Sequence, residues 1–139
     1  MRLIERTREE VFDWVADYRH VRRVLEGVSR WEPIGVQNQG VGARYQVELG
    51  GLPVHLGARL LIVEWKRPTA IGWATESSPV ENRGRWTFRK LAAGTEVVLS
   101  VTYRPPAGAV GNLLASGVEG IVKDRIGAAL DRMKEELEG

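Results

Sequence analysis

The chain has 139 residues, a formal net charge of +2 and an apolar content of 43%. These values predict one globular α+β domain over residues 1–139, with a single hydrophobic core. The absence of cysteine excludes disulfides and cysteine-ligated metal, and no apolar run reaches the roughly 18 residues of a membrane span. The charged N-terminus lacks the apolar core of a signal peptide, which favours a cytoplasmic protein.

Basic residues are scattered along the chain rather than gathered in one run. The tightest groups are 19–23 and 83–85. Proteins that bind nucleic acids usually carry a basic stripe with aromatic stacking platforms, so no nucleic-acid partner is expected. Long arginine side chains that cover apolar surface explain the pattern better.

The N-terminal part of the chain predicts a short strand and two short helices. Residues 1–6 suit the strand. Thr7 and Glu10 form a capping box for a first helix, whose apolar pattern ends near Asp17. A second helix is expected over residues 19–25.

The middle of the chain predicts an antiparallel sheet. Its expected strands cover residues 28–36, 44–49, 54–65, 70–75, 83–91 and 95–104. Pro33 cannot donate a ladder hydrogen bond, which makes the first of these an edge strand. The last two read as a hairpin, in which Trp86 and Phe88 share one face while Arg85 and Arg89 take the other. One face of the sheet is therefore apolar and requires a cover.

A helical pattern from about residue 109 to residue 138 supplies that cover. Its apolar residues form two stripes, roughly a third of a turn apart. The first holds Val110, Leu113, Leu114, Val118 and Ile121, and the second holds Val122, Ile126, Ala129, Leu130, Met133 and Leu137. Gly117 and Gly120 lie between the stripes, and each costs about 1 kcal/mol relative to alanine. The pattern fits two interpretations. The helix is either broken near these glycines, with a looser N-terminal segment that gates an opening, or it is continuous and packs closely on the sheet.

This order of elements resembles the helix-grip fold of the START and Bet v 1-like (SRPBCC) superfamily, particularly its polyketide cyclase/dehydrase and coenzyme Q-binding branch. The resemblance covers nearly the whole chain and is carried by residues 10–18 (EVFDWVADY), 40–42 (GVG), 64–68 (EWKRP), 93–97 (AGTEV) and 130–134 (LDRMK). It implies a curved sheet wrapped around the C-terminal helix, with a cavity between them. Members of the superfamily bind lipids, sterols, quinones, polyketides or plant hormones, and only some are enzymes, so the fold alone does not decide the function.

The cavity should be lined by the apolar face of the sheet and by the helix. The expected ligand-binding residues are Tyr45, Val47, Leu49, Trp73, Trp86, Phe88, Leu99, Val101, Tyr103, Val118, Ile121 and Val122. The same residues suit a closed core, and both interpretations stay open. Residues 60–63 are apolar on both faces, so the inward side of their strand is not predicted. Arg59 and Glu64 lie on opposite faces of a regular strand, and an inward Arg59 would suit an acidic head group.

Catalytic signals in the sequence are few. His20 and His55 lie in no metal-binding spacing, so neither a metal nor another cofactor is expected. No serine lies in a nucleophile elbow. Resemblance to aromatase/cyclases implies polar groups that assist proton transfer, and the candidates are Tyr45, His55, Arg59 and Tyr103. Nothing in their spacing brings these four together.

Three functions are compatible with the sequence. The first is binding of an apolar small molecule, such as a lipid, a quinone or a polyketide. The second is a polyketide aromatase/cyclase or dehydrase that acts in the same cavity. The third is a protein-interaction module without a ligand, which would dock or form a homodimer through the sheet face around Val98 or through an edge strand.

Overall fold

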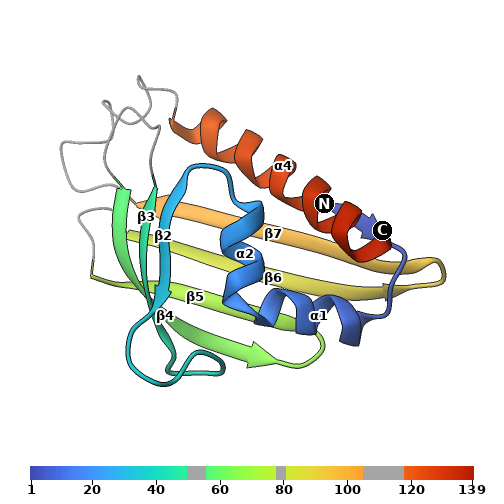
Figure 1. Ribbon diagram of the computed structural model, residues 1–139, viewed down its shortest axis with the longest axis horizontal. Coiled ribbons are helices and arrows are strands. Elements are labelled where there is room, and N and C mark those ends of the chain that lie inside the picture. The colour runs from blue at the N-terminus through green and yellow to red at the C-terminus, as the bar shows by residue number, and fades with distance from the viewer. Residues whose placement is uncertain (50–55, 78–80, 105–117) are drawn as a thin grey trace.

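The computed structural model describes residues 1–49, 56–77, 81–104 and 118–139, whose strands form one antiparallel sheet. The seven strands lie in the order β1-β7-β6-β5-β4-β3-β2. Their bounds are Arg2–Ile4 (β1), Val28–Pro33 (β2), Arg44–Leu49 (β3), Leu56–Lys66 (β4), Ala70–Ser77 (β5), Glu81–Leu91 (β6) and Gly94–Arg104 (β7). The helices are α1 (Arg8–Ala16), α2 (Tyr18–Val24) and α4 (Val118–Glu138). All three cover the same face of the sheet (Figure 1). The predicted helix-grip fold is confirmed.

Side-chain caps determine where the two short helices begin. The backbone N–H of Glu10 donates to the Thr7 hydroxyl at 3.2 Å, which confirms the predicted N-cap of α1. Asp17 ends α1 and caps α2, because its carboxylate accepts the backbone N–H of Arg19 at 3.0 Å. The second helix therefore begins at Tyr18, one residue earlier than the pattern predicts.

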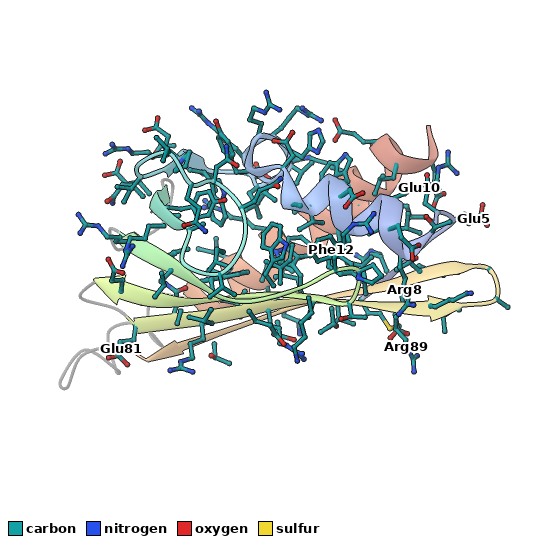
Figure 2. The ribbon with its side chains drawn as sticks, turned by 90° about the horizontal axis from the view of Figure 1, so that it is seen from below. Glu5, Arg8, Glu10, Phe12, Glu81 and Arg89 are labelled. Carbon is teal, nitrogen blue, oxygen red and sulfur yellow. The ribbon has the colours of Figure 1, made fainter. Side chains whose placement is uncertain are left out.

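The strand pattern agrees with the predicted faces of the sheet. β2 is an edge strand, as Pro33 indicates. It ends at Pro33 rather than at residue 36, because Gly35 adopts a positive φ of 85° and turns the chain. In the β6–β7 hairpin Trp86 and Phe88 are buried, whereas Arg85 and Arg89 are exposed. In Figure 2, Arg89 lies on the side of the sheet opposite the helices.

The second predicted stripe of the C-terminal helix packs on the sheet, whereas all of the first stripe except Ile121 lies outside the described side chains. Ala129 and Leu130 are each 1% exposed, and Met133 is fully buried. Gly120 lies inside α4, while Gly117 and the rest of 105–117 lie outside the described residues. None of the helices within the described ranges is long and apolar enough to cross a membrane.

A closed aromatic core fills the space beneath α1. The Phe12 ring forms T-shaped pairs with Trp65 and Phe88 at centroid distances of 5.4 Å and 5.6 Å. Ile4 and Met133 are fully buried in the same cluster. Figure 2 shows Phe12 between α1 and the sheet. Phe12 thus anchors α1 to the sheet at the end where the two chain termini lie (Figure 1).

Candidate ligand-binding site

A pocket of about 110 Å³ opens beside this core, between the sheet, α2 and α4. Its walls are formed by Val21, Leu25, Glu26, Val28, Trp31, Val47, Gly57, Ala58, Leu60, Trp73, Asn82, Trp86, Leu99, Val101, Val122, Arg125 and Ile126. Most of these side chains are aliphatic or aromatic, and the polar exceptions are Glu26, Asn82 and Arg125. An apolar cavity of about 150 Å³ admits benzene, so the described walls leave room for a group of about one ring. This composition is typical of a small-molecule site.

Strand β4 turns alternate side chains toward the pocket. Ala58 and Leu60 line it, whereas Arg59 between them is exposed. Register shifts interrupt the β4–β5 ladder between Arg59 and Leu60 and again between Ile62 and Glu64. Beyond the second shift, Glu64 lies on the outer face, where Arg85 donates to its carboxylate at 2.6 Å. The expectation that Arg59 and Glu64 occupy opposite faces is therefore wrong, because the irregular register resets the alternation.

Trp73 of β5 forms one wall of the pocket and is held at both ends. Its indole N–H donates to the Asn82 side-chain oxygen at 3.0 Å. Gly84 on the neighbouring strand leaves the space that the Trp73 ring occupies, since a Cβ at that position would overlap the ring. An indole nitrogen can only donate, so Asn82 faces Trp73 with its oxygen and offers its amide N–H groups elsewhere.

Two charged residues of the pocket have very different environments. The Glu26 side chain is 64% exposed, and its carboxylate lies 3.6 Å from the Arg132 guanidinium. Nη1 of Arg125, in contrast, is buried and has no hydrogen-bond partner among the residues that the structure describes. The Arg125 guanidinium lies against Gly27, in the space that a side chain there would fill.

The residues predicted to bind a ligand fall into three groups. Those that line the pocket are Val47, Trp73, Trp86, Leu99, Val101 and Val122. Those described but not among its walls are Tyr45, Phe88 and Ile121; Phe88 belongs to the closed core. The side chains of Leu49, Tyr103 and Val118 lie outside the described part of the chain. Trp86 joins core and pocket, because its ring stacks on Phe88 at 6.4 Å while it also forms a pocket wall.

The structure does not bring the described catalytic candidates together. The Tyr45 hydroxyl donates to the backbone carbonyl of Asn38, and burial raises the pKa of Tyr45 to about 12. Arg59 lies on the outer face, away from Tyr45. His55 lies outside the described residues, and so does the Tyr103 side chain.

The His20 side chain is held in place by contacts with Trp14. Its Nδ1 lies 2.7 Å from the backbone carbonyl of Trp14, and its ring stacks on the Trp14 indole at 4.7 Å. Within the described ranges, no three His, Asp or Glu side chains gather as a metal site would require.

Besides Gly57, Ala58 and Leu60 of β4, Asn82 of β6 and Ile126 of α4, two parts of the pocket wall were not predicted from the sequence. One is formed by α2 and the residues that follow it, together with Trp31 of β2. Nothing in their local pattern separates residues facing a pocket from residues facing a core. The other is Arg125, which lies three residues after Val122 and four before Ala129. A charged residue at the edge of an apolar helical stripe was a signal available from the sequence.

A family model described as "Polyketide cyclase / dehydrase and lipid transport" matches residues 2–138. Comparison with curated protein sequences gives no significant match.

Among solved structures, TTHA0849 from Thermus thermophilus is 20% identical with a TM-score of 0.81, and 98% of this chain aligns with 92% of that one. The Zhui aromatase/cyclase from Streptomyces sp. R1128 is 18% identical with a TM-score of 0.77, covering 99% and 90%. The di-domain ARO/CYC BexL is 16% identical with a TM-score of 0.75, covering 99% of this chain and 48% of BexL. These likenesses establish the shared fold, and the match to the family model shows that the chain belongs to the polyketide cyclase/dehydrase and lipid transport family.

Proposed function

We propose that this protein binds an apolar small molecule, polyketide-like or lipid-like, in the pocket between the sheet, α2 and α4. The observation that carries the proposal is the composition of the pocket walls. Trp31, Trp73 and Trp86 enclose the space together with aliphatic side chains from the sheet and from both helices. A small apolar pocket with a few polar groups is the usual form of a ligand site.

Titration with N-phenyl-1-naphthylamine, a neutral dye that fluoresces in apolar surroundings, tests the proposal. The pocket volume matches one of its ring groups, and the rest of the dye would extend toward the surface at Glu26, whose side chain is 64% exposed. We expect saturable binding with one dye per chain. Ala58→Phe and Val122→Phe introduce rings into the pocket from the sheet and from the helix, and each should reduce dye affinity at least tenfold. Val63→Phe is the matched control, because Val63 lies on β4 but is 49% exposed. Absence of saturable binding, or equal loss in all three variants, would refute the proposal.

A polyketide cyclase or dehydrase acting in this pocket is the second candidate. Two observations favour it: the pocket contains two ionisable side chains, Glu26 and Arg125, and the Zhui neighbour is described as an aromatase/cyclase. Positioned polar groups accelerate proton transfer about a hundredfold or more. The test is incubation with a linear poly-β-ketone thioester, with aromatic product followed by absorbance. Product formation no faster than in buffer would remove this candidate.

Further expectations accompany the proposal. We infer one domain over the 139 residues, a cytoplasmic location, no nucleic-acid partner and the ability to form a homodimer. Light scattering across a range of concentrations tests the assembly state, and cell fractionation tests the location. A dimer that forms equally well when the pocket is filled by Ala58→Phe would favour a separate interaction surface.

A further inference from the structure

We propose that Arg125 recognises an oxyanion on the ligand, so that the preferred ligand is an apolar molecule with one acidic oxygen group. This inference rests on the proposed function and specifies its ligand class. Its starting point is the Arg125 guanidinium, whose Nη1 is buried without a hydrogen-bond partner in the described part of the chain. Arg125 also belongs to the pocket wall, between Val122 and Ile126 on α4.

An unpartnered guanidinium N–H in such a place is energetically costly. Withdrawing a charged donor from water without a replacement partner destabilises the folded protein. Arginine cannot escape this cost by losing its proton, because guanidinium stays charged in proteins. A ligand oxyanion in the pocket would balance the guanidinium charge by accepting a charge-assisted hydrogen bond, and it would do so in the apolar surroundings where such bonds are strong.

The neighbouring carboxylates do not neutralise Arg125. Glu26 also faces the pocket, but its closest basic partner is Arg132, at 3.6 Å, and its side chain is largely exposed. No carboxylate oxygen lies within 4 Å of the Arg125 guanidinium among the described residues. Asp124 is adjacent in sequence but exposed on α4. Glu26 would disfavour an anion only weakly, because Arg132 and solvent screen its charge.

The chain fold places the guanidinium in a defined position. Gly27 follows α2 with a φ of 79°, a conformation that glycine adopts without strain. Its missing side chain leaves the space that the Arg125 guanidinium occupies. The planar group is therefore held at the α2 side of the pocket, whereas β5 and β6 contribute the wall of Trp73 and Asn82. A ligand would place its oxyanion at α2 and its apolar body against the tryptophans.

Competition between two probes of nearly equal shape tests the inference. At neutral pH 2-naphthoic acid carries a carboxylate, whereas its methyl ester is neutral. Each displaces N-phenyl-1-naphthylamine from the pocket, and the dye itself needs no anion. A charge-assisted hydrogen bond contributes about 1.5–3 kcal/mol, so we expect the acid to bind roughly ten- to hundredfold more tightly than the ester. Arg125→Met should abolish this preference, so that the acid and the ester bind with equal affinity.

Lys123→Met is the matched control, because it removes one positive charge from the same helix at an exposed position. It should keep the acid preference within twofold. Arg125→Gln is a second variant that retains a polar side chain, and dye binding reports whether each variant is folded. Equal affinity for acid and ester in the wild type, or an acid preference that survives both Arg125 variants, overturns the inference. Loss of dye binding by the wild type instead overturns the proposed function.

Discussion

The indole ring of Trp73 lies across Gly84 on the adjacent strand, in the space where any other residue would place its Cβ. Gly84→Ala should therefore displace the ring, break the Trp73–Asn82 hydrogen bond and deform the pocket wall. We expect a loss of about 1–3 kcal/mol in the free energy of unfolding, the usual range for overpacking, and at least tenfold weaker dye binding. Chemical denaturation and dye titration measure the two effects.

Gly72→Ala is the control for this prediction. Its Cβ would meet the flexible Glu64 side chain at 3.2 Å on the outer face, so the loss should be smaller and dye binding intact. Equal effects of the two substitutions would show that a methyl group anywhere in β5 or β6 suffices, and that the Trp73–Gly84 packing has no special role.

Phe88 and Leu99 should separate stability from binding. Phe88 is 2% exposed in the closed core against Phe12, whereas Leu99 lines the pocket. Phe88→Leu should lower the free energy of unfolding by roughly 1–2 kcal/mol and leave dye affinity within twofold. Leu99→Ala should change dye affinity while costing less than the roughly 2–5 kcal/mol of a fully buried leucine. If Phe88→Leu mainly changed dye affinity and Leu99→Ala mainly changed the free energy of unfolding, the division of the interior into core and pocket would be contradicted.

Tyr45 should act as a structural group rather than as a proton donor. Its hydroxyl is engaged by the Asn38 carbonyl, and burial raises its pKa to about 12. Tyr45→Phe should cost about 1 kcal/mol and leave dye binding unchanged. Because the folded-state pKa exceeds the unfolded value of about 10, the stabilisation from neutral Tyr45 persists below pH 10 and is lost toward pH 12.

Alkaline denaturation of the wild type and of Tyr45→Phe measures this difference. The two stability curves should converge as the pH rises from 10 to 12. A tenfold loss of dye affinity in Tyr45→Phe would instead place the hydroxyl in the binding site.

The hairpin and the helix could be predicted because their patterns are local. Alternation alone places Trp86 and Phe88 inward, and the 3.6-residue period places Leu130 and Met133 on the sheet. Core and pocket could not be separated in this way, because Trp86 and Phe88 share one face of one strand. What separates them is the position of α1 and α2 above the sheet, which depends on contacts between distant residues.

The inward-facing side of β4 is a second feature that the local sequence did not predict. Alternation predicts opposite faces for Arg59 and Glu64, but the register shift between Ile62 and Glu64 skips one residue of β4 and places both on the outer face. A bulge depends on the partner strand as much as on its own residues, so the local sequence does not reveal it. Arg125 is different, because a charge beside an apolar stripe is visible in the sequence and only its missing partner required the structure.

Asp17 should make the α2 wall of the pocket sensitive to acid. The side-chain hydrogen bond from Arg19 lowers the pKa of Asp17 to about 2, against the opposing effect of partial burial. Because the folded-state pKa lies below the unfolded value of about 3.9, the stabilisation from ionised Asp17 is complete well above pH 4 and is lost as the pH falls toward 2. Asp17→Ala also removes the N-cap of α2, with a cost of about 1 kcal/mol at neutral pH.

Urea denaturation between pH 7 and pH 2 tests this dependence by comparing the wild type with Asp17→Asn. Asparagine caps helices as well as aspartate does but carries no charge, so the difference between the two proteins isolates the ionised carboxylate. We expect this difference to be constant above pH 5 and to vanish toward pH 2. Asp124→Asn, which removes the same charge from an exposed position on α4, is the matched control. Since Val21 and Leu25 of the α2 wall line the pocket, dye affinity should fall over the same pH range, and an unchanged affinity would show that α2 is held by its packing alone.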